Sequence, residues 1–311
     1  MKKPNLTRVA AVVAALLAGV ALTDAQATTF TIGNYDPLFQ GIAETSATIQ
    51  GGSGVSQAYV VRIDLNAPGV GFTTTPHSGS LETTSQTTSQ FLASSGSQVA
   101  INAAFFDPCG CSTTTSDAKN LEGLAISSGA LVSPDQVGNA SLLITQDNHA
   151  SMAAGGTANT SNIWTAVSGG GFVLQNGIDV VNGSLPGDPL NPNPRSIVGL
   201  SQDGSTMFLV AIDGRQARYS NGVTQAEEAD FMYALGAYNA INLDGGGSTA
   251  LVVQGADGSP DTLNRPSGGA QRYDGNNLGV YAAPLAPVPL PPALALLGSG
   301  LLGLFGVRRR K

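Results

Sequence analysis

Three consecutive glycines stand between two short apolar runs in the segment Asn239–Val253. The first run ends at Asp244, Gly245 to Gly247 follow, and Ser248 and Thr249 lead into the second run. This order predicts a strand, a tight glycine loop and another strand. A two-residue hairpin turn needs only one or two glycines, and each further glycine costs conformational entropy. The loop therefore indicates backbone that a ligand can approach, with amide groups able to bind an anion; a flexible hairpin is the structural alternative.

The glycine loop does not match the common nucleotide-binding motifs. A P-loop needs a lysine before its Ser or Thr to reach the phosphates. Gly247 occupies that position, and the chain has no lysine between Lys119 and Lys311. The spaced glycines of a dinucleotide-binding fold are also absent. The acid beside the loop, Asp244, instead indicates catalysis or metal binding.

Seven motifs, in the same order along the chain, resemble those of the phosphodiester glycosidase family. They are Asn102–Phe106, Gly169–Gly177, Pro194–Gly199, Leu209–Arg215, Glu227–Met232, Asn239–Ser248 and Asn264–Arg272. The resemblance spans residues 55–283. Two features depart from the family pattern: Ala103-Ala104 replaces a more glycine-rich pair, and Cys109-Gly-Cys111 is an insertion. The resemblance implies hydrolysis of a sugar-1-phosphate diester in an exopolysaccharide or cell-envelope glycan.

The leaving group of that reaction is a phosphate monoester, which is already a stable anion. The site then needs positive charge that holds the phosphate more than it needs a general acid. Arginine suits this task because its guanidinium forms bidentate hydrogen bonds with phosphate. The candidate phosphate-binding and substrate-binding residues are Arg195, Arg215, Arg272, Asn102, Asn242, Gly245, Gly246, Gly247 and Ser248. The two asparagines could bind sugar hydroxyls or orient the backbone.

The candidate catalytic carboxylates are Asp244, Asp213 and Glu227. Asp213 and Asp244 each follow an apolar run and precede a glycine, so neighbouring strands would place both acids at one edge of a sheet. Asp213 could instead belong to an Asp-Gly turn. Glu227 could instead complete a capping box with Thr224 at the start of a helix.

The sequence specifies no cofactor. A divalent cation beside Asp244 would need several oxygen ligands, and no motif identifies them. Phe105 or Phe106 could stack on a sugar ring, although phenylalanine is more often a core residue. The alternative function is a non-catalytic glycan-binding protein of the extracellular matrix. The paired strand-end acids and the arginines favour the enzyme, because a binding module has no need of two such acids.

Composition narrows the class of protein further. Charged residues are 11% of the chain and glycine is 40 of 311 residues, a profile typical of loop-rich, β-rich extracellular proteins. The formal net charge of −7 argues against a nucleic-acid partner, whose phosphates need a basic surface. The length is sufficient for one large domain with a sizeable core.

Periodicity predicts an α+β fold in which a single domain holds a mixed, largely antiparallel sheet and a few helices. Strands are predicted at 58–65, 99–105, 123–127, 130–132, 141–145, 166–174, 196–201 and 206–213. Helices are predicted at 84–94 and, with Thr224 and Gly236 as caps, at 224–235. The domain would occupy residues 55–283, after a polar lead-in at 28–54.

Residues 1–27 have the features of a secretory signal peptide. Lys2, Lys3 and Arg8 precede an apolar run at 9–22, and Ala25-Gln-Ala27 provides a small-residue cleavage site for signal peptidase. We therefore expect secretion across the inner membrane.

Residues 284–311 contain a proline-rich spacer, the motif Val288–Pro292, an apolar run at 293–307 and the basic end Arg308–Lys311. This order is similar to a PEP-CTERM sorting signal, which an exosortase cleaves. The resemblance implies a transient membrane anchor, followed by an extracellular or envelope-associated mature protein. A permanent C-terminal anchor is the alternative, although the apolar run is short for a membrane span.

The two cysteines, Cys109 and Cys111, are separated by one residue. They cannot complete a tetrahedral zinc site alone, and His77 and His149 have no metal-binding spacing. A disulfide between them is compatible with an oxidising compartment. It could staple a loop or have a redox role.

Overall fold

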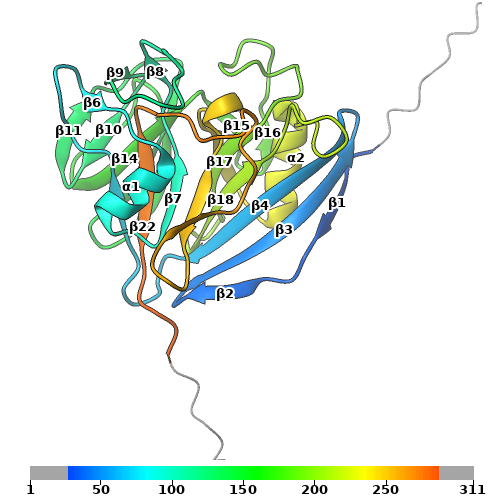
Figure 1. Ribbon diagram of the computed structural model, residues 1–311, viewed down its shortest axis with the longest axis horizontal. Helices are drawn as coiled ribbons and strands as arrows, with labels where there is room; N and C mark the ends of the chain where they lie inside the picture. The colour runs from blue at the N-terminus through cyan, green and yellow to red at the C-terminus, as the bar shows by residue number, and fades with distance from the viewer. Residues whose placement is uncertain (1–26, 287–311) are drawn as a thin grey trace, which may run out of the picture.

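The computed structural model describes residues 27–286. The predicted signal peptide up to residue 26 and the sorting motif from residue 287 onward lie outside the described residues. The described chain is mainly β, with two α-helices (Figure 1). Within this range, every pairing between named strands is antiparallel. This agrees with the predicted antiparallel sheet with few helices, and no parallel pair of the expected mixed sheet occurs among these strands.

A nine-stranded sheet forms the largest unit, with strand order β1-β3-β4-β18-β17-β19-β15-β16 and β2 paired to β3. Its strands are β1 (Thr29–Ile32), β2 (Asp36–Phe39), β3 (Ile42–Gly51), β4 (Gly54–Asp64), β15 (Phe172–Gln175), β16 (Ile178–Asp179), β17 (Arg195–Leu200), β18 (Thr206–Ile212) and β19 (Asn239–Asn242). Three of these strands lie within the predicted lead-in at 28–54. There β3 pairs with β4 from Ile42 to Gly51 and buries Ala47 and Ile49 on alternate positions. The many Ser and Thr residues between them hide this alternation in the sequence.

Three smaller sheets complete the fold. One contains β5 (Gly71–Thr74), β7 (Val99–Asn102), β20 (Leu251–Gln254), β21 (Pro260–Thr262) and β22 (Asn277–Tyr281). Another contains β10 (Ala125–Ser127), β11 (Ala130–Ser133), β12 (Ala140–Thr145), β13 (Ala150–Ala154) and β14 (Ile163–Gly169), and the smallest contains β6 (Thr83–Thr84), β8 (Phe106–Asp107) and β9 (Ala118–Leu121). Together they form the half of the molecule opposite the long strands β3 and β4 in Figure 1.

Both predicted helices are confirmed, as α1 (Thr88–Ser95) and α2 (Gln225–Leu235). Each begins with a capping box, at Thr87 and Thr224, and each ends at a glycine with positive φ. Figure 1 shows α2 against the nine-stranded sheet and α1 against β7 and β22. Phe231 and Met232, on the buried face of α2, pack in a hydrophobic core.

The main core lies between the nine-stranded sheet and the two five-stranded sheets. Adjacent residues of β4 pack on opposite faces of the sheet. Val61 packs in this main core, whereas Val60 points to the other face and packs with α2. Both side chains are fully buried. Among residues 27–286, no helix is long and apolar enough to span a membrane.

Strand order determines where the candidate acids lie. β17 is antiparallel to both β18 and β19, so β18 and β19 run in the same direction and end at the same edge. Asp213 follows β18 directly, and Asp244 lies two residues beyond β19. The predicted strand–loop–strand around the three glycines is confirmed. However, β19 and β20 belong to different sheets, so the glycine loop joins two sheets rather than closing a hairpin.

Candidate active site

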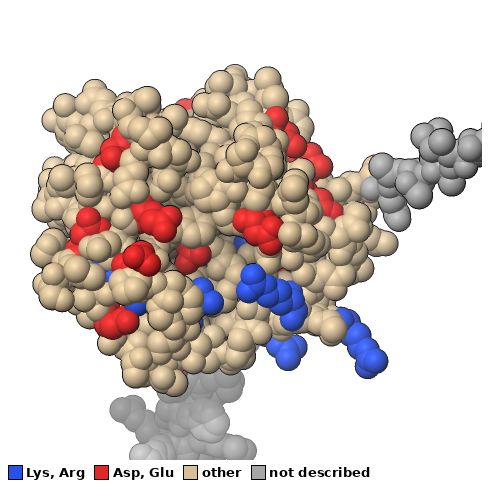
Figure 2. Space-filling view, turned by 90° about the horizontal axis from the view of Figure 1, so that it is seen from above, with Lys and Arg blue, Asp and Glu red and all other residues tan. Residues whose placement is uncertain are grey.

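A cavity of about 300 Å³ lies at the edge where β18 and β19 end. Its lining residues are Phe105, Gly187, Asp188, Asn193, Arg215, Asp244, Gly245, Gly246, Gly247 and Arg272. It brings together one predicted acid, two predicted arginines and all three loop glycines. Figure 2 views the end of the molecule that is uppermost in Figure 1, where acidic side chains are scattered and Lys and Arg side chains gather in the lower part of the view.

The glycines of the loop allow the two arginines to approach the backbone. Gly246 has a φ of +62°, and a Cβ there would lie 3.2 Å from a terminal nitrogen of Arg215. A Cβ on Gly247 would collide with the guanidinium of Arg272. Gly246 also begins the short 3-10 helix η1 (Gly246–Ser248). A side chain at Gly247 would displace the guanidinium of Arg272, and one at Gly246 would be strained at positive φ and would crowd Arg215.

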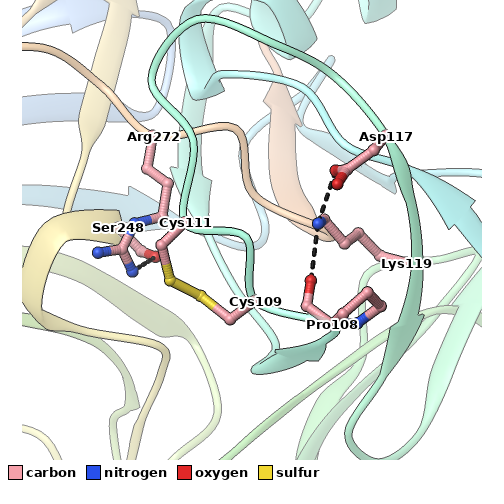
Figure 3. Close-up of a disulfide and its surroundings, with 7 residues drawn as sticks. All are labelled: Pro108, Cys109, Cys111, Asp117, Lys119, Ser248 and Arg272. Atoms are coloured by element: carbon pink, nitrogen blue, oxygen red, sulfur yellow. Dashed lines mark hydrogen bonds and ion pairs between the residues drawn. A yellow bond between two sulfur atoms is a disulfide. The ribbon is translucent and has the colours of Figure 1, made fainter.

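Arg272 is held by a residue that does not itself line the cavity. Its Nη1 donates a hydrogen bond to the Ser248 hydroxyl at 3.1 Å. Figure 3 shows this pair beside the disulfide that joins Cys109 and Cys111. The backbone N–H of Tyr273, the next residue, donates to the carbonyl of Ser112 in the same loop. The disulfide loop therefore supports the segment that carries Arg272.

The disulfide loop is itself fixed by the buried Lys119. Its ammonium donates to the carbonyl of Pro108 at 2.7 Å and pairs with Asp117 at 2.6 Å (Figure 3). The loop-staple interpretation of the two cysteines agrees with these contacts. A redox role is not tested by them.

Arg215 is oriented by a polar network that the sequence analysis did not identify. Its Nε and Nη2 donate to Oδ1 of Asn193 at 3.0 and 2.8 Å. Asn193 in turn donates to Asp188, which also accepts from Asn191. These two hydrogen bonds and then the nearby arginines lower the pKa of Asp188. Asp188 is thus an ionised acid on the cavity wall, in addition to Asp244. Its local sequence, Gly187-Asp-Pro-Leu-Asn191, indicates only a turn.

Asp244 is partly exposed, and its exposed part faces the cavity. Its backbone is fixed on both sides: the carbonyl accepts from Nδ2 of Asn102 at 2.5 Å, and the N–H donates to the carbonyl of Ala103 at 2.8 Å. Desolvation raises the pKa of Asp244 to about 6, while Ser248 and Arg272 act in the opposite direction and Glu122 raises it further. The carboxyl therefore titrates close to neutral pH.

Asp274 is a buried acid next to this group that the sequence analysis missed. It is 1% exposed, and neither side-chain oxygen makes a hydrogen bond to the described residues. Burial raises the pKa of Asp274 well above its usual range, and the charge of Asp244 adds to the shift. Ser248 and Arg272 oppose the rise in pKa at both carboxyls. Asp274 precedes a glycine just as Asp213 and Asp244 do, and this pattern could have identified it.

Asp213 lies at the same sheet edge as Asp244 but does not line the cavity. Its carboxylate accepts from Nδ2 of Asn264 at 3.0 Å, from the backbone N–H of Arg265 at 3.0 Å and from the Tyr219 hydroxyl at 3.1 Å. Burial raises the pKa of Asp213, and these hydrogen bonds oppose the shift. The contacts fix the chain segment that leads to Arg272.

Glu227 also lies outside the cavity lining. It completes the capping box of α2 with Thr224, the alternative given above. Its carboxylate also accepts from the N–H and the hydroxyl of Ser53, in the turn between β3 and β4. These contacts show a structural use of Glu227 and bring it no nearer to Asp244; its catalytic role stays a prediction.

Arg195 is buried and uses its guanidinium on backbone carbonyls. It donates to those of Val223, Gly187, Asp188 and Asn191 at 2.5 to 3.0 Å. Three of these carbonyls belong to the loop that carries Gly187 and Asp188 into the cavity wall. The contacts support positioning of that loop, and direct phosphate binding by Arg195 stays a prediction.

The two predicted asparagines differ in their contacts. Asn102 fixes the backbone of Asp244 and accepts from the Ser196 hydroxyl and the N–H of Ala250. Asn242 is buried, and its amide makes no hydrogen bond to any described residue. Its Nδ2 lies beneath the cavity-lining Gly187, 3.0 Å from where a Cβ would stand.

The described residues contain no group of three or more His, Cys, Asp or Glu side chains that could hold a metal ion. Of the two phenylalanines considered above, Phe105 lines the cavity, whereas Phe106 is buried in the core.

Comparison with known proteins agrees with the motifs. A sequence model for phosphodiester glycosidases matches residues 95–281, more than half of the chain. The chain therefore belongs to the phosphodiester glycosidase family. A shorter match, 38% identical over 63 residues, is to the SPbeta prophage-derived protein YomE of Bacillus subtilis, and it spans 20% of this chain and 10% of that protein.

Solved structures share the fold at low sequence identity. The catalytic domain of zebrafish N-acetylglucosamine-1-phosphodiester alpha-N-acetylglucosaminidase, auto-inhibited by its pro-peptide, is similar with a TM-score of 0.56 at 17% identity, over 83% of this chain and 88% of that one. A putative exported protein from Burkholderia pseudomallei has a TM-score of 0.58 at 14% identity, over 82% and 97%. A hypothetical protein from Synechocystis has a TM-score of 0.55 at 16% identity, over 79% of this chain but 64% of its own.

Proposed function

We propose that this protein is a secreted hydrolase that cleaves a sugar-1-phosphate diester linkage in an exopolysaccharide or cell-envelope glycan. The observation that carries the proposal is the single cavity that holds Asp244 together with Arg215 and Arg272. An acid alone would fit many glycosidases, and two arginines alone would fit many anion-binding sites. Their combination fits a substrate that has both an anomeric carbon and a phosphate.

The two arginines hold the phosphodiester in this proposal. The guanidinium of Arg215 lies against Gly246, and that of Arg272 lies against Gly247. Asn193 and Ser248 each accept from one edge of a guanidinium, which leaves other N–H donors for phosphate oxygens. Positive charge at this point stabilises the departing phosphate monoester. The need to bind and stabilise a phosphate explains why the site contains guanidinium groups that are fixed in position.

Asp244 acts in its ionised form at the anomeric carbon. Because the phosphate leaves as an anion, little general-acid assistance is needed, and a carboxylate can stabilise an oxocarbenium-like transition state and accept a proton from the attacking water. With a pKa of about 6, Asp244 is mostly ionised above neutral pH. Burial and the charge of Asp244 raise the pKa of the neighbouring Asp274 well above its usual range, which opposes a second negative charge beside Asp244.

The decisive experiment measures release of phosphomonoester and free sugar from a UDP-sugar and from synthetic sugar-1-phosphodiesters. Turnover that is lost in Asp244→Asn and retained in Asp203→Asn, a change at an exposed acid of the β17–β18 turn, would support the proposal. No turnover over a broad panel of sugars and anomers, with glycan binding retained, would favour the non-catalytic matrix protein.

The same reaction in ¹⁸O-labelled water identifies the bond that is cleaved. The proposed attack at the anomeric carbon places the label in the sugar. Label in the phosphate would show P–O cleavage and would remove the proposed role of Asp244.

Secretion and sorting belong to the same proposal. Signal peptidase would remove residues 1–27, and an exosortase would cut near Val288–Pro292, releasing a protein that associates with the envelope or extracellular matrix. Intact-mass measurement on protein from the native host tests this. A mature chain that still ends at Lys311 in the membrane fraction would show a permanent anchor instead.

A further inference from the structure

A second, larger cavity of about 940 Å³ lies away from Asp244, at the turn ends of β12 and β14. Its wall includes Trp164, the single tryptophan of the chain, together with Gln146, Asp147, His149 and Asn162. Trp164 is 36% exposed. Exposed aromatic residues occur singly on many proteins and need no explanation by themselves. Here, however, the ring shares one hollow with several hydrogen-bonding side chains.

The surroundings of the indole hold it in place. A Cβ on Gly129 would lie 3.6 Å from Cε3 of Trp164, so the ring lies over a glycine backbone. That glycine has a φ of +78°, and its N–H donates to the Trp164 carbonyl at 2.9 Å. The tight turn between β10 and β11 therefore supports the ring and leaves part of it open to the cavity. A rigid, supported aromatic surface loses little entropy when a ligand stacks on it.

The polar residues of the cavity provide both donors and acceptors. Oδ2 of Asp147 lies 3.0 Å from Nδ1 of His149, and Oδ1 accepts from the Thr145 hydroxyl at 2.5 Å. These hydrogen bonds lower the pKa of Asp147, so its carboxylate is ionised. The amides of Gln146 and Asn162 are exposed beside it. An aromatic face with planar amide and carboxylate groups matches a pyranose ring, which has an apolar C–H face and an equatorial rim of hydroxyls.

We propose that this cavity is a glycan-binding site, separate from the cleavage site, that takes a neutral hexose unit stacked on Trp164. The ionised Asp147 disfavours uronic acids and phosphorylated sugars, which selects neutral residues. The proposal does not rest on the cleavage reaction.

The position of the site on β14 shows how it could serve the enzyme. Trp164 lies at the start of β14, whereas Gly169 and Gly170 lie at its end, where a Cβ on Gly170 would stand 3.1 Å from the cavity-lining Phe105. Six residue steps along a strand separate the two ends by about 20 Å. A glycan chain held at Trp164 would keep other units of the same polymer near the cleavage site and raise their effective concentration.

The single tryptophan makes the test specific, because a change in intrinsic fluorescence on ligand binding reports on Trp164 alone. The probes are neutral pentasaccharides of β-1,4-linked glucose, β-1,3-linked glucose and α-1,6-linked mannose, with an oligogalacturonate as the charged comparison. We expect a saturable emission change with at least one neutral probe and a weaker response to the oligogalacturonate. Gln146→Ala should weaken binding several-fold with the reporter intact.

Calorimetry with the same probes tests the ring itself. Trp164→Ala should weaken binding about tenfold or more, as loss of a central interface tryptophan commonly does. Trp164→Phe should retain part of the affinity and guards against a folding defect. Tyr233→Ala, a change at another exposed aromatic residue, should leave binding unchanged.

The proposal is overturned if no probe gives a saturable change up to about 10 mM, or if folded Trp164→Ala binds as tightly as the parent. The Asp244→Asn variant separates the two functions. It should lose turnover of a small sugar-1-phosphodiester and keep oligosaccharide binding, whereas binding without turnover in the parent would refute the cleavage reaction alone.

Discussion

Two strand ends at the same edge of the large sheet carry the same sequence pattern and have different surroundings. At the end of β18, Asp213 is surrounded by donors from Asn264, Arg265 and Tyr219. Beyond β19, Asp244 has its backbone fixed while its carboxylate faces a cavity between two arginines. The first acid holds a neighbouring segment in place and the second is available to a ligand. An acid after an apolar strand therefore marks a position in the fold, and its partners decide its use.

The largest expected effect comes from removing the charge of Asp244. Asp244→Asn keeps the shape of the side chain, and we expect turnover to fall by about 10² to 10⁴-fold, as for loss of a general acid or base. Steady-state kinetics on a sugar-1-phosphodiester measures this. Near-normal turnover would mean that Asp244, like Asp213, is structural.

Asp213→Ala tests the other strand end. Three donors would lose their acceptor, and we expect a loss of about 2–3 kcal/mol in the free energy of unfolding. Activity per folded molecule should stay within about tenfold of the parent, because Asp213 does not line the cavity. Urea denaturation followed by kinetics separates the two quantities. A stable variant without activity would place Asp213 in the catalytic machinery and remove the contrast.

Arg272→Lys examines the charge that surrounds Asp244. The substitution keeps a positive charge and loses the bidentate geometry, so kcat/KM for the phosphodiester should fall about tenfold. Arg218→Lys, at an exposed arginine that is not part of the cavity lining, is the matched control. Equal effects of the two substitutions would show that Arg272 does not contact the phosphate.

The parent and the Asp244→Asn variant should also differ in how the free energy of unfolding depends on pH. The folded-state pKa of Asp244, about 6, lies above its ordinary value of 3.8. Its contribution to stability is therefore fully present below about pH 4 and is lost as the pH rises to about 6. Asp244→Asn should match the parent near pH 4 and exceed it by about 1 kcal/mol at pH 7, a figure reduced for partial exposure. Thermal melting at both pH values checks this, and a difference that does not change with pH would contradict it.

The smallest effect concerns the pH dependence of the reaction. Because the ionised form of Asp244 is the active one in our proposal, kcat/KM should fall as the pH drops through about 6. Glu122 raises the pKa of Asp244, so in Glu122→Gln the fall in kcat/KM should occur at a pH lower by a few tenths of a unit. If the fall in kcat/KM occurred at a higher pH in this variant, a group other than Asp244 would control it.

The sequence alone identified the glycine loop, the acid before it and two arginines that do line one cavity. These were accessible because the signals are local: glycine triplets, strand ends and capping boxes depend on neighbouring residues. The β1–β3 strands were not recognised, because their alternation is formed by Ala and Ile between many Ser and Thr residues. Pairing with β4 supplies the stability that such a strand lacks by itself.

Only the tertiary structure distinguished Asp244 from Asp213, and Arg215 and Arg272 from Arg195. Asp213 and Asp244 share the same local pattern, an apolar run before the acid and a glycine after it, and no local motif states which arginines face a ligand. The difference lies in the contacts that each side chain makes in the fold. Asp213 meets Asn264 and Arg265 across about fifty positions, and Arg195 meets the carbonyls of a loop that precedes it. Whether a charged group has all its hydrogen bonds within the protein or can still bind a ligand depends on the number of partners that folding brings to it. The sequence by itself determines which charges the chain has and at which strand ends they stand; long-range packing decides which of them face a ligand.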